Sequence, residues 1–96
     1  MAAYIIVDGE VTDSEKMEIY KSQAKPLVES FGGEYLARGG PMSVKENQRW
    51  TPHRLVLLKF PSMEQAEFFY NSPAYQALLP ISREASRRTL VIFEGV

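Results

Sequence analysis

The chain contains no cysteine and only one histidine among its 96 residues. The absence of cysteine excludes disulfide bonds, thiolate nucleophiles and cysteine-ligated metal sites. A single imidazole excludes a metal site built from several histidines of one chain. The sequence also lacks an H-E-x-x-H pair, a P-loop and a G-x-G-x-x-G loop. We therefore expect no bound metal and no cofactor.

An excess of either charge is also absent, because eleven basic and twelve acidic side chains leave a net charge of −1. Such a chain has no broad field to attract nucleic acid or an anionic membrane. The apolar run at the N-terminus ends at Asp8 and follows no basic region, unlike a signal peptide or a membrane span. We expect a cytoplasmic protein that binds neither nucleic acid nor membrane.

The length and composition predict one small domain over residues 1–96. The apolar fraction of 45% is ordinary for a globular protein. A chain of this size buries roughly 60–65% of its unfolded surface, so its core is modest. Association with a second copy would therefore add to its stability.

Apolar spacing and capping residues predict the secondary structure. The β-branched run Ile5-Ile6-Val7 indicates a strand over residues 3–10. A capping box of Thr12 and Glu15 begins a helix that ends at Gly32 and should kink at Pro26. The remaining predicted elements are strands over residues 34–38, 53–60 and 89–94, a helix from Ser62 to Asn71, a short helix from Ser72-Pro73, and a restart at Pro80 before residues 81–86.

This β-α-β-β-α-β order predicts an α+β, ferredoxin-like fold with a four-stranded antiparallel sheet. Two right-handed crossovers place both helices on one face of that sheet. The other face is left bare, although three of the strands are apolar on both sides. We predict that the same face of a second copy covers it, which gives a homodimer. Trp50, in the polar loop over residues 40–52, is a candidate lid or dimer contact.

Arg38 is the first candidate functional residue, and it stands between two glycine pairs. Gly32-Gly33 ends the first helix, whereas Gly39 and Gly40 mark a sharp exit from the second strand. A guanidinium beside exposed backbone N–H groups can hold a carboxylate or an enolate. Simple alternation along the strand places Arg38 on the face opposite Tyr35.

Asp8 and His53 are the candidate proton-transfer residues. Asp8 ends the first strand, and apolar neighbours could raise the pKa of its carboxyl so that it serves as general base. The alternative is an aspartate that bonds turn backbone, or one that forms a structural ion pair with Arg38. A carboxylate of a partner chain is another possible partner for Arg38. His53 is the one imidazole and could shuttle protons, but a strand end is also an ordinary place for a surface histidine.

Tyr20, Tyr75 and Arg83 are the candidate ligand-positioning residues. Both tyrosines fall on apolar helix faces, where they either line a pocket or pack in the core. We expect Arg83, Arg87 and Arg88 to close the last helix, where cations suit the helix dipole. Arg83 is the one of the three that could also point into the pocket.

A set of short motifs also carries a family resemblance over residues 3–95. The motifs are Tyr4-Ile5-Ile6-Val7-Asp8, Tyr20, Gly32-Gly33, Arg38-Gly39-Gly40, Ser72-Pro73 with Tyr75 and Gln76, Arg83, and Glu94-Gly95. On these residues the chain resembles the small bacterial proteins called domain of unknown function 1330, in the dimeric α/β-barrel superfamily. The resemblance implies a ferredoxin-like homodimer whose sheets face each other. It implies no activity, because this family has none firmly assigned. Relatives in the superfamily include cofactor-independent monooxygenases, haem-degrading enzymes, isomerases, dehalogenases and sensing domains, and the fold alone does not choose among them.

The leading functional hypothesis is a pocket between sheet and helices that binds a small anionic or enolisable organic molecule. If the protein is an enzyme, we expect cofactor-free acid–base chemistry in which Arg38 stabilises the anion and Asp8 or His53 is the base. Two alternatives stay open. One is a non-catalytic binding or sensing module that uses the same pocket, and the other is an interaction protein without a pocket.

Overall fold

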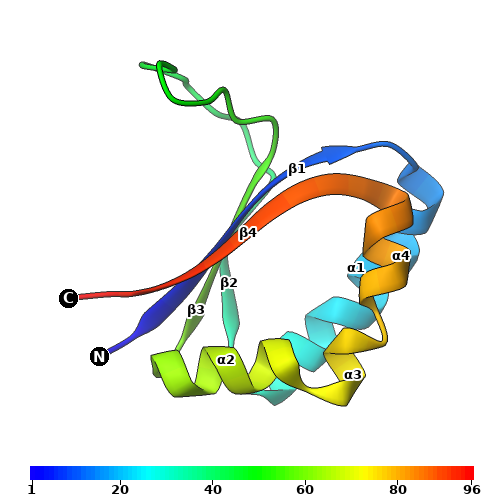
Figure 1. The fold of residues 1–96 in the computed structure, drawn as a ribbon, viewed down its shortest axis with the longest axis vertical. Helices are drawn as coiled ribbons and strands as arrows, with labels where there is room; N and C mark the ends of the chain where they lie inside the picture. The colour runs from blue at the N-terminus through cyan, green and yellow to red at the C-terminus, as the bar shows by residue number, and fades with distance from the viewer.

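The structure, a computed structural model, describes all of residues 1–96. Its elements are β1 (Ala3–Val11), α1 (Ser14–Ser30), β2 (Glu34–Arg38), β3 (Leu55–Phe60), α2 (Met63–Asn71), α3 (Pro73–Gln76), α4 (Leu79–Ala85) and β4 (Ser86–Glu94). The strands form one antiparallel sheet in the order β2-β3-β1-β4, and the helices cover one of its faces (Figure 1). This is the predicted α+β, ferredoxin-like fold, and within one chain the sheet is open rather than closed into a barrel.

The core lies between the sheet and the helix layer. Alternate residues of the two central strands point toward the helices because side chains alternate across a pleated sheet. These buried strand residues are Ala3, Ile5 and Val7 of β1 and Val56, Leu58 and Phe60 of β3. From the helices, Phe69 of α2 stacks on Phe60 with ring centroids 5.3 Å apart. The inner face of the sheet is therefore apolar through its centre.

The first helix begins and ends at local sequence signals, with one correction. Asp13 rather than Thr12 is the N-cap, and its carboxylate accepts a hydrogen bond from the N–H of Lys16 at 3.1 Å. Thr12 is instead held by the end of α4, because its own N–H donates to the carbonyl of Ala85. The helix continues as one element through Pro26. Gly32 follows its end with φ of +85°, as a glycine helix stop requires.

Serine caps begin the next two helices as predicted. The hydroxyl of Ser62 accepts from the N–H of Gln65 at 3.0 Å, and that of Ser72 accepts from the N–H of Tyr75 at 3.2 Å. The Gln65 side chain does not complete a capping box. It donates instead to the carbonyl of Phe31 at 2.8 Å, and so ties the start of α2 to the end of α1.

The last strand begins three residues earlier than the sequence pattern predicts. Arg87 and Arg88 therefore belong to β4, and the prediction that they close the last helix is wrong. β1 extends to Val11 and supplies backbone partners along this whole length, with Gly9 opposite Arg88. Figure 1 shows β1 and β4 curving together over the far end of the helix layer.

A β-bulge in β2 decides where Arg38 points. Tyr35 pairs with Leu58 and Arg38 pairs with Val56, and the register shifts between Tyr35 and Ala37. The extra residue changes the phase of the strand, so the prediction that Arg38 faces away from Tyr35 is wrong. Both side chains lie on the inner face, and the Arg38 guanidinium carbon is 4.4 Å from the centroid of the Tyr35 ring.

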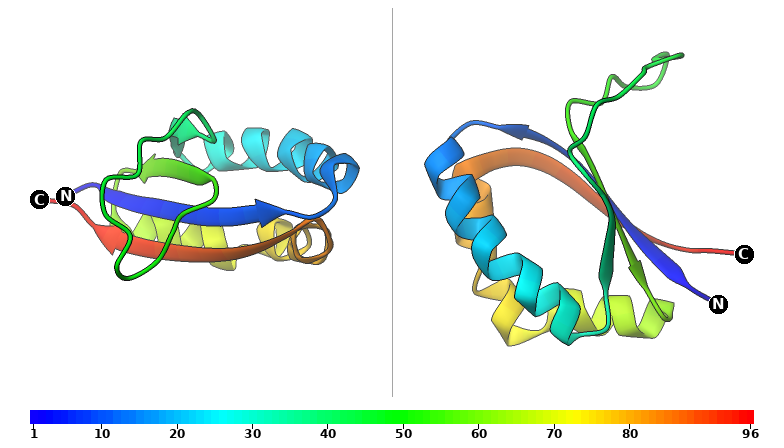
Figure 2. Two further views of the ribbon diagram at one scale, coloured as in Figure 1. Left: turned by 90° about the horizontal axis from the view of Figure 1, so that it is seen from above. Right: turned by 180° about the vertical axis from the view of Figure 1, so that it is seen from behind.

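The outer face of the sheet carries apolar side chains that no helix covers. Val91 and Phe93 are 47% and 43% exposed, and the ring of Phe93 lies 5.9 Å from that of Tyr4. The segment between β2 and β3 projects away from the body of the molecule beside this face (Figures 1 and 2). None of the helices combines the length and apolar character needed to cross a membrane.

Candidate functional site

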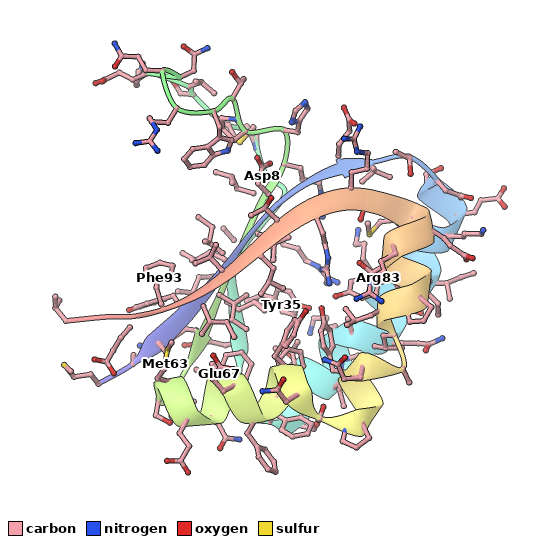
Figure 3. All side chains as sticks on the ribbon, in the orientation of Figure 1. Asp8, Tyr35, Met63, Glu67, Arg83 and Phe93 are labelled. Carbon is pink, nitrogen blue, oxygen red and sulfur yellow. The ribbon has the colours of Figure 1, made fainter.

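A partly enclosed cavity lies between the inner face of the sheet and the helices. The volume that the centre of a water-sized molecule can occupy in this cavity is about 60 Å³. The residues that line it are mostly aliphatic and aromatic. One water needs roughly 10–15 Å³ on this measure, so the enclosed part of the cavity has room for about four to six water-sized groups, and the cavity is open to solvent on one side. Tyr35 is one of its walls and points from the sheet toward the helices (Figure 3).

Arg88, Tyr20 and Tyr75 form the polar centre of this cavity. The Arg88 guanidinium donates from Nη1 to the hydroxyl of Tyr20 at 3.1 Å and from Nη2 to that of Tyr75 at 2.7 Å. The two hydroxyls are hydrogen-bonded to each other at 2.7 Å. Only one of the two hydroxyl protons can lie in that bond. The other hydroxyl proton is therefore free to be donated to a ligand.

Tyr75 and Arg88 are each held in one protonation state. Burial raises the pKa of Tyr75 well above its ordinary value, and the neighbouring hydroxyl of Tyr20 acts in the same direction. Tyr75 therefore stays a neutral phenol. Burial alone would lower the pKa of Arg88, but the two tyrosine oxygens outweigh it, so the pKa of Arg88 is raised. The cavity thus contains a protonated guanidinium with donors to spare.

Three further cations line the same cavity, namely Lys21, Arg38 and Arg54. Arg38 lies over Tyr35 and donates from Nη2 to the backbone carbonyl of Lys21 at 3.4 Å. The guanidinium of Arg54 lies against the backbone of Gly39, where a Cβ atom would overlap it. Gly39 also has φ of +70°, so glycine is needed there both for the turn and for the placing of Arg54.

No carboxylate lines the cavity to balance these cations. The ion pairs of the chain use lysines and the histidine, and Lys21 pairs with Glu18 at 3.4 Å. Arg38, Arg54 and Arg88 form no ion pair. Positive charge held in apolar surroundings without a counter-charge is costly. The cavity therefore has the electrostatic character of an anion site.

Asp8 and His53 lie on the opposite face of the sheet. Oδ1 of Asp8 accepts the N–H groups of His53 and Arg54 at 2.8 and 3.2 Å, and Oδ2 accepts the indole N–H of Trp50 at 2.9 Å. Burial would raise the pKa of Asp8, but these donors outweigh it and hold the pKa below its ordinary 3.8. The His53 ring is largely exposed and faces Glu10 at 3.6 Å. The structure thus gives Asp8 the backbone-bonding role and does not bring either residue to Arg38. Figure 3 shows Asp8 and Tyr35 on different sides of the sheet.

The other predicted residues lie at or beyond the rim. Arg83 borders a separate, more open cleft of about 470 Å³ at the edge of β4, which shares Arg88 with the cavity. The N–H of Gly39 already donates to the carbonyl of Leu55 at 2.8 Å. Gly40 lies in open space. The N–H of Gly39 is therefore already used and is not free to bind an anion.

Sequence reasoning did not place Arg88 and Arg54 at this cavity. The sequence did carry a signal for Arg88. Leu90 and Ile92 point inward, and if the strand is extended toward the N-terminus the same alternation makes residue 88 point inward as well. Arg54 carries no such signal. It precedes β3, and its direction depends on its backbone bonds to Asp8 and Gly9, which are distant in the sequence.

A comparison with family models finds one match, which covers residues 2–96 and is described as "Domain of unknown function (DUF1330)". No curated protein matches the chain. Among solved structures, a protein of unknown function from Rhodopseudomonas palustris superposes with a TM-score of 0.74 at 14% identity, covering 99% of this chain and 82% of that one.

Two further solved structures bear on the fold. SnoaB, a cofactor-independent oxygenase from Streptomyces nogalater, has a TM-score of 0.70 at 7% identity and covers 99% of this chain and 93% of its own. A dimeric ferredoxin-like protein of unknown function from Thermobifida fusca has a TM-score of 0.65 at 16% identity, with 99% and 92% coverage. At these identities the likeness extends to the fold alone.

Proposed function

We propose that this chain, which belongs to the family described as domain of unknown function 1330, binds a small organic anion in the cavity between its sheet and helices. One observation carries the proposal. Arg38, Arg54 and Arg88 line a largely apolar cavity in which no carboxylate balances them. An anionic ligand supplies the missing charge, and the apolar walls take its carbon skeleton.

Arg88 is the anchor of the proposed site. A guanidinium has five N–H donors, and the two tyrosine hydroxyls use two of them. Its planar fork matches the two oxygens of a carboxylate. The free hydroxyl proton of the Tyr20–Tyr75 pair adds a donor next to it. A carboxylate or an enolate oxygen would therefore meet several converging donors.

A second candidate function is a cofactor-free acid–base enzyme that acts on an enolisable substrate. The supporting observation is that a tyrosine hydroxyl with a free proton lies beside the Arg88 guanidinium. Such donors stabilise charge that develops on an oxygen during enolisation. Because Asp8 and His53 lie on the outer face, neither is the base for this site, and the neutral tyrosine pair serves as the proton donor to the developing oxyanion.

We also propose that a second copy of the chain covers the outer face of the sheet. The exposed side chains of Val91 and Phe93 support this arrangement, as does Trp50, which is 59% exposed on the projecting loop. The solved structure from Thermobifida fusca, described as dimeric, has the same fold. Two such faces packed together would remove a contiguous apolar surface from water.

The test of anion binding uses two neighbouring arginines on opposite faces of β4. Butyrate and valerate are titrated calorimetrically into the wild type, Arg88→Gln and the matched control Arg87→Gln. Hydrogen bonds to a charged group contribute about 1.5–3 kcal/mol, so Arg88→Gln should weaken binding by about 10- to 150-fold. Arg87→Gln removes the same charge from an exposed side chain and should change the affinity little. Equal weakening in both variants, or no binding to the wild type, would refute the proposal.

A further inference from the structure

The arginines of the cavity approach it from two sides of Gly9. In the sheet, Gly9 of β1 lies opposite Arg88 of β4. On its other side, the N–H of Gly9 donates to the carbonyl of Arg54 at 3.0 Å. Arg88, Gly9 and Arg54 therefore follow one another across neighbouring strands, and all three line the cavity. With neighbouring strands about 4.8 Å apart, the backbones of the two arginines are separated by about 10 Å.

Gly9 forms the floor of the cavity between Arg54 and Arg88, and because it has no side chain the space above it is open. Its backbone does not have a positive φ, so its conformation does not require glycine. A Cβ atom there would meet the Cβ of Arg88 at 3.4 Å, which is an ordinary contact. The neighbouring inward residues of β1, Val7 and Val11, both carry branched side chains. The absence of a side chain at Gly9 is therefore what keeps this part of the cavity free.

The cavity has two cationic ends, one at Arg88 and one at Arg54, and the surroundings of these two arginines differ. On the β4 side, Arg88 is bonded to Tyr20 and Tyr75. On the β2 side, the Arg54 guanidinium lies against Gly39, next to the end of the strand that carries Arg38. A ligand with one negative charge would meet the first end and leave the second without a counter-charge.

We infer that the ligand carries two anionic groups joined by a short carbon chain, as in a small dicarboxylate. Arg88 and the tyrosine pair hold one carboxylate, Arg54 and Arg38 hold the other, and the chain crosses the open floor at Gly9. The small volume of the cavity restricts this class to short chains. The inference rests on the proposed function, because it assigns the second end of the same anion site.

The experiment compares acids of equal chain length that differ in one carboxylate. Succinate is paired with butyrate and glutarate with valerate, and each is titrated calorimetrically at matched ionic strength. The wild type should bind each dicarboxylate about tenfold or more tightly than its monocarboxylate partner. Arg54→Gln should abolish this preference, because it weakens the dicarboxylate far more than its monocarboxylate partner. Arg49→Gln, on the exposed loop, removes the same charge and should keep the preference.

A second variant keeps all the arginines. Gly9→Val should fill the floor and weaken dicarboxylates more than monocarboxylates, and ligand-free melting curves check that each variant is folded. Equal affinity of the wild type for both members of a pair overturns the dicarboxylate inference but leaves the anion site standing. The dicarboxylate inference is also overturned if Arg54→Gln or Gly9→Val keeps the full wild-type preference for dicarboxylates. A wild type that binds none of the four acids overturns the proposed function as well.

Discussion

Asp8 fastens the long loop to the sheet, and replacing it by asparagine should loosen the loop without affecting the anion cavity. An asparagine Oδ1 can still accept the N–H groups of His53 and Arg54. Its amide N–H₂, however, would face the indole N–H of Trp50, so a donor would oppose a donor. Hydrogen bonds to a charged group contribute about 1.5–3 kcal/mol when buried. At this partly exposed site we expect Asp8→Asn to lose about 1 kcal/mol.

The effect depends on pH in a direction fixed by the lowered pKa of Asp8. Burial opposes ionisation, but the N–H groups of His53 and Arg54 and the Trp50 indole outweigh it, so the folded-state pKa lies below the ordinary 3.8. The stabilisation by the carboxylate is therefore fully present above pH 3.8 and is lost as the pH falls through the lowered folded-state pKa. The difference in unfolding free energy between wild type and Asp8→Asn should shrink over this acid range.

The assay is chemical unfolding followed by the fluorescence of Trp50, which is the one tryptophan of the chain. A loss of about 1 kcal/mol corresponds to a melting temperature about 4–8 °C lower in a domain of this size. Glu10→Gln, which removes a neighbouring exposed carboxylate from the same strand, is the matched control. If Asp8→Asn kept wild-type stability at neutral pH and instead lost carboxylate binding, Asp8 would belong to the binding site and the reasoning would be refuted.

The remaining predictions concern the outer face and the core. Phe93→Arg should convert the proposed dimer to a monomer, so that light scattering at micromolar concentration gives half the wild-type mass; a monomeric wild type would end the dimer proposal. Gly33→Ala should lower the free energy of unfolding by about 1–3 kcal/mol in urea, because its Cβ would overlap the buried ring of Phe60 and lie 2.8 Å from Cγ1 of Val28. Gly40→Ala, which meets nothing within 4 Å, is the control, and equal stability of the two variants would contradict this packing argument.

Signals between residues close in the chain made the fold predictable. The serine caps at Ser62 and Ser72 and the glycine stop at Gly32 form where they were expected, because each depends on backbone groups only a few residues away. The alternation in β1 and β3 likewise identified the core of the sheet. The order of these elements was enough to give the ferredoxin-like topology.

The candidate site was predicted only in part. Tyr20, Tyr75 and Arg38 line one cavity between the sheet and the helices, where polar groups were expected, and their role in binding stays a prediction. Asp8 was a candidate because apolar neighbours could raise the pKa of its carboxyl, and His53 because it is the one imidazole. The side chains of both lie on the other face of the sheet, which only the pairing of the strands reveals.

The sequence by itself determined the elements, their order and an apolar sheet with one uncovered face, because these follow from local propensity and periodicity. Only the tertiary structure decided which charges meet in the cavity. Arg38 reaches it through a bulge, Arg88 through the extension of β4 along β1, and Arg54 through backbone bonds to residues of β1. Each of these placements depends on pairing between strands far apart in the chain, and a shift of one residue in that pairing would turn the side chain to the opposite face.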